Sequence, residues 1–211
     1  MQNIFIIRHG ETEYNRLGCV QGSGIDTSLN EKGRQQAEAF YNHYSHIPFS
    51  RIYVSSLLRS QESVKSFAGH NIITERHPGL NEISWGTFEG RHISNLHKTY
   101  YEELVIKWQK GETHHGIEGG ESPDDVAKRQ RKVIDLIMQR EDDENVLVCM
   151  HGRAMRIFLC QLLQLPLQNM SQFRHHNLGL YQVTISPDGR RTLARENCIA
   201  HLNQILVNAE E

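Results

Sequence analysis

Two short runs of apolar residues most constrain how this chain can fold. "NIFII" at residues 3–7 and "ENVLVCM" at residues 144–150 are almost continuously apolar and rich in β-branched residues. Strands that helices cover on both faces have this pattern, whereas strands with one face in water alternate between apolar and polar residues. We therefore expect an α/β fold with a mostly parallel sheet and helices on both faces.

Segments with a helical period separate the apolar runs. In residues 28–44 apolar positions recur every three to four residues, and Ser28 and Glu31 have the spacing of a capping box. Residues 122–140 show the same period, with Ser122 as the predicted N-cap. Further elements are predicted as strands at 51–56 and 71–75, a buried helix at 153–165, and late strands joined by a Pro-Asp-Gly turn within 179–202.

The composition agrees with one folded domain over residues 1–211. A chain of this length can bury a core without disulfides, and its four cysteines have no paired spacing. A formal net charge of −2 gives no electrostatic support for a nucleic-acid or membrane partner. No signal peptide or membrane-spanning run is visible, so a cytoplasmic protein is expected. Residues 91–119 fit no strand–helix repeat and are expected to form an inserted cap.

Reactive side chains follow the apolar runs directly. The carboxyl ends of parallel strands meet at one edge of a sheet, where α/β proteins bind their ligands. The residues expected at this edge are Arg8, His9, Arg59, His151 and Gly152, and a loop between glycines adds Glu82.

Two arginines, two histidines and one carboxylate suit phosphoryl transfer. A guanidinium group can donate two parallel hydrogen bonds to the oxygens of a phosphate, so Arg8 and Arg59 are expected to clamp a phosphoryl group. Their charge disfavours an imidazolium and would keep His9 neutral and nucleophilic. His9 could then attack phosphorus, Glu82 could protonate the leaving alkoxide, and His151 could stabilise the transferring oxygens. Because this site supplies its own positive charge, no metal or other cofactor is expected.

The same residues carry a family resemblance. "RHGETEYN" at residues 8–15 resembles the signature of the histidine phosphatase superfamily, the phosphoglycerate mutase-like proteins. The resemblance continues in order through "TSLNEKGRQQA", "SSLLRSQES", "LNEISWGTFEG", "GGES" and "VLVCMHGRAMR". It implies a three-layer α/β/α sandwich with a small helical cap. It also implies a phosphorylated His9, Glu82 as the proton donor, and a substrate pocket completed by Arg8, Arg59, His151, Asn15, Gln21, Gly22 and Gly152.

The residues after Glu82 favour the phosphatase branch of that family. Cofactor-dependent mutases carry "ERHYG" at the acid glutamate, whereas this chain continues with "ISWGTFEG". The predicted function is metal-independent hydrolysis of a small phosphorylated metabolite. A cofactor-dependent phosphoglycerate mutase, a fructose-2,6-bisphosphatase-like enzyme and a non-catalytic phosphate-binding module stay as alternatives. Arg153 could contact a second anionic group of the substrate, whose identity the sequence leaves open together with the oligomeric state.

Other polar clusters are expected to be structural. The pairs His114-His115 and His175-His176 lack the spacing of zinc ligands and are expected to lie in solvent-exposed loops. The basic stretch at residues 128–132 is interleaved with a helical apolar stripe and is expected to be a solvated helix face.

Overall fold

A six-stranded sheet forms the centre of the computed structural model, which describes residues 1–70, 72–92, 98–140 and 142–203. The strand order is β3-β2-β4-β1-β5-β6. β1 to β4 run parallel, β5 is antiparallel to β1, and β6 is antiparallel to β5, so the mostly parallel sheet is confirmed. The strands are β1 (Gln2–Arg8), β2 (Arg51–Val54), β3 (Ile73–Arg76), β4 (Asn145–Met150), β5 (Leu180–Ile185) and β6 (Arg191–Cys198).

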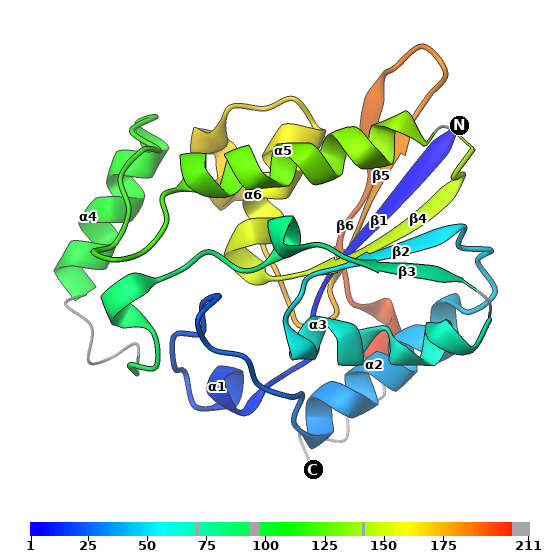
Figure 1. Cartoon of the computed structure of the whole chain (residues 1–211), viewed down its shortest axis with the longest axis horizontal. Coiled ribbons are helices and arrows are strands. Elements are labelled where there is room, and N and C mark those ends of the chain that lie inside the picture. The colour runs from blue at the N-terminus through cyan, green and yellow to red at the C-terminus, as the bar shows by residue number, and fades with distance from the viewer. Residues whose placement is uncertain (71, 93–97, 141, 204–211) are drawn as a thin grey trace.

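Helices cover both faces of the sheet, which explains why its central strands are apolar throughout. Successive strand residues point to opposite faces. Ile6 therefore belongs to the core under α5 and α6, and its neighbour Ile7 to the core under α2. Figure 1 shows α5 and α6 on one side of the sheet and α2 and α3 on the other, which is the predicted three-layer sandwich. These helices are α2 (Glu31–Tyr44), α3 (Leu58–Ser63), α5 (Pro123–Gln139) and α6 (Gly152–Leu162).

Capping residues fix where the two long amphipathic helices begin. Ser122 is the N-cap of α5, as predicted, and it forms a complete capping box with Asp125. For α2 the predicted cap is wrong: Asn30, not Ser28, accepts a hydrogen bond of 2.8 Å from the Gly33 N–H. The chain is still extended before Asn30 because Leu29 forms a β-bridge with Thr12. Within the described ranges, no helix is long and apolar enough to cross a membrane.

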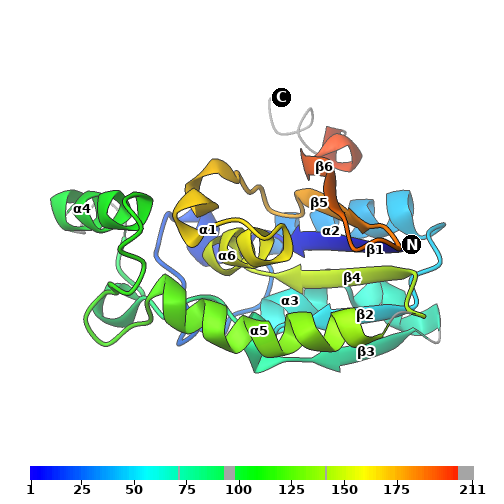
Figure 2. The same ribbon diagram turned by 90° about the horizontal axis from the view of Figure 1, so that it is seen from above.

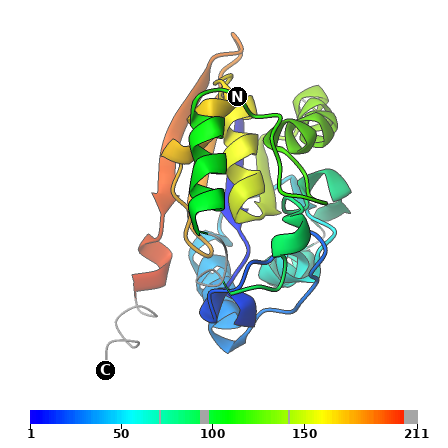
Figure 3. The same cartoon turned by 90° about the vertical axis from the view of Figure 1, so that its left-hand side faces the viewer.

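The carboxyl ends of β1 and β4 point to the same edge of the sheet, as the arrowheads in Figure 2 show. In the register of the ladder, Arg8 at the end of β1 lies opposite Met150 at the end of β4. Figure 3 looks at this edge and shows α4 (Lys98–Gln109) in front of it. The remaining elements are α1 (Glu13–Arg16) and the 3₁₀ helices η1 (Lys65–His70), η2 (Pro78–Leu80), η3 (Gly86–Phe88), η5 (Leu167–Gln172) and η6 (Ala200–Leu202).

The segment expected to form a cap contains α4, which Figures 1 and 2 show extending away from the sheet beyond the strand ends. Residues 93–97 of this segment lie outside the described residues, as does Asn71 at the start of a predicted strand. The division of the chain into a domain with an inserted cap at about residues 91–119 stays a prediction.

Candidate active site

The ends of β1 and β4 bring two buried histidines together. His9 follows β1, His151 follows β4, and the centroids of their rings lie 5.0 Å apart. His9 is 3% exposed and His151 is fully buried. Because the two strands are hydrogen-bonded neighbours, the matching His-Gly pairs of the sequence meet at one point.

Hydrogen bonding decides which nitrogen of His9 is free. Its Nδ1 lies 2.7 Å from the Gly10 carbonyl oxygen, which can only accept, so Nδ1 carries the proton and Nε2 has a lone pair. Burial, followed by the charges of Arg59 and Arg8, holds the pKa of His9 well below its usual range. The ring is therefore a neutral imidazole, which is the form that can act as a nucleophile.

Arg8 and Arg59 bring positive charge to the site. Arg59 is fully buried and donates to the carbonyl oxygens of Ile25 at 2.7 Å and Gly22 at 3.2 Å. Arg8 Nη1 lies 3.3 Å from His175 Nδ1. In the part of the chain that the structure describes, the Nε atoms of both arginines are buried without a hydrogen-bond partner. Burial lowers the pKa of Arg59 to about 10. An anion that accepts from these donors would relieve the cost of burying them unpaired.

Ser55, at the end of β2, fixes the tautomer of His151. Ser55 Oγ donates to Asn81 Oδ1 at 3.0 Å and accepts from the Leu57 N–H at 3.0 Å. It must therefore accept from His151 Nε2, which lies 2.7 Å away, and this bond places the ring proton on Nε2. His151 Nδ1 has no hydrogen-bond partner among the described residues. This nitrogen is the atom of His151 that is left to interact with a bound group.

The carboxylate of Glu82 binds the first backbone N–H groups of α6. Its Oε1 accepts from the N–H groups of Ile83 at 2.9 Å and Ala154 at 2.8 Å, and its Oε2 accepts from the N–H of Arg153 at 3.1 Å. A helix N-terminus favours an acidic group at this place. Oε1 has two donors but Oε2 has one, so Oε2 is the oxygen with room for a transferable proton.

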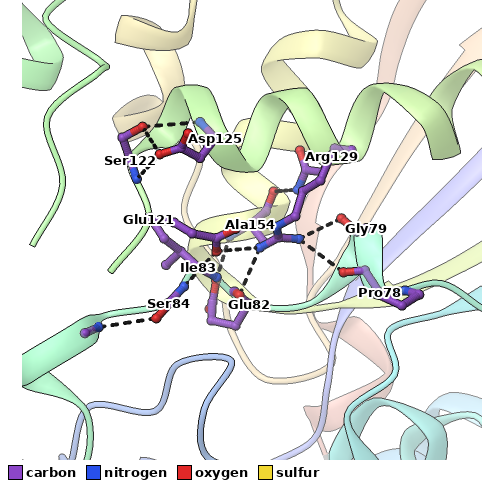
Figure 4. Close-up of polar contacts among 12 residues, drawn as sticks. Pro78, Gly79, Glu82, Ile83, Ser84, Glu121, Ser122, Asp125, Arg129 and Ala154 are labelled. Carbon is purple, nitrogen blue, oxygen red and sulfur yellow. Dashed lines mark hydrogen bonds and ion pairs between the residues drawn. The ribbon is translucent and has the colours of Figure 1, made fainter. Parts of the chain in front are cut away.

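Arg129 of α5 holds the segment that carries Glu82, as Figure 4 shows. It donates to the carbonyl oxygens of Glu82 at 3.0 Å and Gly79 at 2.8 Å, and its Nε donates to Glu121 Oε1 at 2.8 Å. Glu121 Oε2 in turn accepts from the Ser84 N–H at 2.9 Å. The predicted solvated face at residues 128–132 is therefore wrong for Arg129, and also for Gln130, which is fully buried and donates to the Ala154 carbonyl oxygen at 2.8 Å. The apolar period of α5 does not reveal that a polar residue at its margin turns inward.

A cavity of about 400 Å³ opens at this edge of the sheet, within the size range of small-molecule sites. The predicted site residues that line it are Arg8, His9, Asn15, Gln21, Glu82, Gly152 and the singled-out Arg153. Three predicted site residues do not line the cavity. Arg59 and His151 are fully buried, and the carbonyl oxygen of Gly22 accepts a hydrogen bond from Arg59. Lining residues that the sequence did not single out include Tyr14, Trp85, Phe88, Tyr101, His175 and Asn177.

His175 corrects an expectation from the sequence. It was expected in a solvent-exposed loop, but it lines the cavity beside Arg8, and burial together with Arg8 lowers its pKa to about 3. Asn177 Nδ2, two residues on, donates to the His9 carbonyl oxygen at 2.9 Å. Because β5 is antiparallel to β1, the residues before β5 lie beside the carboxyl end of β1. Recognising that pairing would have pointed to both residues.

Buried guanidinium groups around a neutral histidine, next to a carboxylate at a helix N-terminus, define an anion-binding site of the kind used for phosphoryl transfer. Within the described residues, no group of three or more His, Cys, Asp or Glu side chains is placed to hold a metal ion.

Comparison with known proteins identifies the family. The sequence model of the Histidine phosphatase superfamily (branch 1) matches residues 4–198, so the chain belongs to this superfamily and the predicted family is confirmed. The protein is therefore an enzyme, a hydrolase of the phosphoglycerate mutase-like family.

Individual relatives agree with this assignment. A putative phosphoserine phosphatase 2 from Hydrogenobacter thermophilus is 23% identical over 97% of this chain and 100% of its own length. A probable phosphoglycerate mutase GpmB from Yersinia enterocolitica is 30% identical over 87% of this chain and 85% of its own. The crystal structure of a phosphoserine phosphatase mutant from Entamoeba histolytica, in complex with phosphoserine, is 27% identical with a TM-score of 0.82, and the match covers 96% of this chain and 100% of that one.

Proposed function

We propose that the protein hydrolyses small phosphomonoesters through a phosphohistidine on His9. The observation that supports this most is the hydrogen bond from His9 Nδ1 to the Gly10 carbonyl oxygen, which leaves Nε2 unprotonated near the charges of the fully buried Arg59 and the half-buried Arg8. In the first step, the bond from Nε2 to phosphorus forms and the bond from phosphorus to the alcohol oxygen breaks. Glu82 Oε2 gives its proton to that oxygen. In the second step, water attacks phosphorus, the bond to Nε2 breaks, and Glu82 takes a proton from the water.

The remaining site residues are proposed to bind the phosphoryl oxygens. The Nε atoms of Arg8 and Arg59 are buried donors without a partner in the described structure, so they can donate to an incoming phosphoryl group. Because the ring proton of His151 is on Nε2, we propose that Nδ1 accepts a hydrogen bond from a protonated oxygen of the same phosphoryl group. Asn15 and Gln21 line the cavity and complete its wall. This arrangement supplies cationic charge from side chains, so we propose that hydrolysis needs no metal ion.

Mutase activity is a second candidate, because the same intermediate can pass its phosphoryl group to another hydroxyl group. One observation favours it: the relative from Yersinia enterocolitica, at 30% identity, is a probable phosphoglycerate mutase. The two activities separate when 3-phosphoglycerate is supplied with a 2,3-bisphosphoglycerate primer. We expect phosphate release to exceed isomerisation, and the opposite result would favour the mutase.

Trapping the intermediate tests the proposed mechanism. The wild-type enzyme, quenched within one turnover of a ³²P-labelled phosphomonoester, is expected to carry acid-labile label on His9. The His9→Ala variant should carry no label and lose activity by on the order of 10³-fold or more. His46→Ala, at an exposed histidine of the same chain, serves as the matched control. Full activity of the His9→Ala variant would refute the proposal.

A further inference from the structure

Arg153 has a buried guanidinium group with one end lacking a partner. Its side chain lines the cavity and the residue is 8% exposed. Its Nη2 donates to the Tyr101 hydroxyl oxygen at 2.7 Å, and its Cζ lies 5.2 Å from the ring centroid of Trp108 and 5.9 Å from that of Trp85. Aromatic rings on this group fix its orientation and attract its charge. Nη1, in contrast, is buried with no hydrogen-bond partner among the described residues.

No carboxylate within the described ranges forms an ion pair with Arg153. Glu82, the acid that reaches the start of α6, already accepts from the backbone N–H groups of Arg153 and Ala154 there, and from that of Ile83. One turn further along α6, Arg156 Nε is also buried without a described partner. Burial, and next the charge of Arg153, lowers the pKa of Arg156 to about 10. Positive charge without a paired carboxylate therefore gathers near the start of α6, where Arg153 lines the cavity.

The position of Arg153 shows which part of a substrate it would meet. Its backbone N–H binds Glu82 Oε2, the oxygen from which the leaving group is proposed to take a proton. Its guanidinium lies one side-chain length away, toward Trp85 and Tyr101. Arg8 and His9 line the same cavity from the end of β1. A group that contacts Arg153 therefore belongs to the alcohol part of the substrate and not to the phosphoryl group that is transferred.

We infer that Arg153 binds a second anionic group, a carboxylate or a second phosphate, on the alcohol of the substrate. The inference rests on the proposed function and narrows its substrates to phosphomonoesters with two anionic groups. Such a group accepts from Nη1, whereas a neutral alcohol leaves this buried donor unpaired. Tyr101 and Trp108 belong to α4, so α4 orients the cation that selects the substrate. Charge-assisted hydrogen bonds of this kind correspond to roughly 10- to 100-fold in kcat/KM.

Three phosphate esters on one three-carbon chain test the inference. Propyl phosphate is neutral at its far end, 3-(phosphonooxy)propanoate carries a carboxylate there, and propane-1,3-diyl bisphosphate carries a second phosphate. For the wild-type enzyme, kcat/KM for at least one of the two anionic esters should exceed that for propyl phosphate by roughly 10-fold or more. Which ester is preferred distinguishes a carboxylate from a phosphate as the group that is bound.

Variants then assign this preference to Arg153. In Arg153→Met the ratio of kcat/KM values should fall to within about threefold of one. Tyr101→Phe keeps the charge but removes the hydroxyl that orients it, and should give an intermediate ratio. Arg131→Met, which removes an exposed cation of α5, is the matched control and should keep the wild-type ratio. Thermal melting of each variant checks that it is folded.

Either of two kinetic results would overturn the inference: equal kcat/KM for all three esters in the wild-type enzyme, or an unchanged preference in Arg153→Met. Calorimetric binding of the same esters to His9→Ala separates this failure from failure of the proposed function. If no ester is hydrolysed, yet His9→Ala binds an anionic ester roughly 10-fold more tightly than propyl phosphate and loses this difference with Arg153→Met, the inference stands and the proposed function fails. Equal binding of all three esters overturns the inference.

Discussion

Arg129 and Glu121 are expected to control the protonation step proposed for Glu82, although neither lines the cavity. Arg129 donates to the Glu82 carbonyl oxygen at 3.0 Å and pairs with Glu121, which accepts from the Ser84 N–H at 2.9 Å (Figure 4). These contacts hold the backbone on both sides of Ile83. Replacing Arg129 by methionine removes all the hydrogen bonds that the guanidinium donates while keeping most of the side-chain volume.

The size of the effect follows from these contacts. Charge-assisted hydrogen bonds contribute about 1.5–3 kcal/mol each where they are well buried. Arg129 and Glu121 are 22% and 27% exposed, so solvent weakens the pair, and we expect Arg129→Met to lower the free energy of unfolding by roughly 2 kcal/mol in total. General acid catalysis contributes about 10²- to 10⁴-fold in rate, and it depends on placement within about 1 Å. A shifted Glu82 should therefore slow a reaction that needs its proton by roughly 10- to 100-fold.

Leaving groups of different basicity provide the assay. Propanol leaves as a strongly basic alkoxide and needs a proton, whereas p-nitrophenolate is weakly basic and leaves without one. Arg129→Met should lower kcat/KM for propyl phosphate by roughly 10- to 100-fold but change that for p-nitrophenyl phosphate by no more than about threefold. Glu121→Gln should act in the same direction with a smaller effect. Lys132→Met, at an exposed position of the same helix, is the control.

An equal loss of kcat/KM with both substrates would refute this reasoning. It would mean that Arg129 affects activity only by changing how much of the enzyme is folded. Unchanged hydrolysis of propyl phosphate would refute it as well, since the placement of Glu82 would then not depend on the Arg129–Glu121 pair. Unfolding of each variant in urea, measured in parallel, separates a loss of stability from a loss of acid catalysis.

Two further predictions concern proton uptake and metal removal. Burial lowers the pKa of His201 to about 4, whereas in the unfolded chain it should be about 6.5, so the stability that a neutral His201 provides above pH 6.5 is lost as the pH falls toward 4. Between about pH 7.5 and about pH 5.5, the free energy of unfolding measured in urea should fall by about 1.4 kcal/mol more for the wild-type protein than for His201→Leu. An equal fall in the two proteins would contradict this prediction. Because arginines supply the positive charge, EDTA should leave the hydrolysis of p-nitrophenyl phosphate unchanged, and loss of activity that zinc or magnesium restores would show a metal requirement.

The pattern of apolar runs alone predicts the part of the site that is built at strand ends. His9 and His151 each follow an apolar run directly, and neighbouring parallel strands bring such residues together whatever lies between them in the chain. The fold was predictable for a similar reason, since continuous apolar runs require cover on both faces. These are local patterns, and each needs only a few consecutive residues to be visible.

Contacts between distant segments were not predictable in this way. A Cβ atom on Gly10 would lie 2.6 Å from the Gly33 carbonyl oxygen, so this glycine lets the loop after β1 approach the start of α2. The need for glycine at position 10 depends on a residue 23 positions later, and nothing in "RHGE" reveals that need. Arg129 is a similar case, because a basic residue at the margin of an amphipathic helix looks the same whether it faces water or a carbonyl oxygen.

Local patterns and distant contacts serve different parts of the proposed chemistry. Three of the residues proposed to bind and transfer the phosphoryl group, Arg8, His9 and His151, lie at strand ends, whose geometry the sheet fixes. The residue proposed to bind the alcohol part of the substrate is Arg153 on α6. Its side chain is oriented by the side chains of Tyr101 and Trp108 on α4. Substitutions on α4 can therefore change which alcohol is accepted without moving His9. Short sequence motifs therefore suffice to predict the type of reaction, whereas predicting the preferred substrate requires the contacts between α4 and α6.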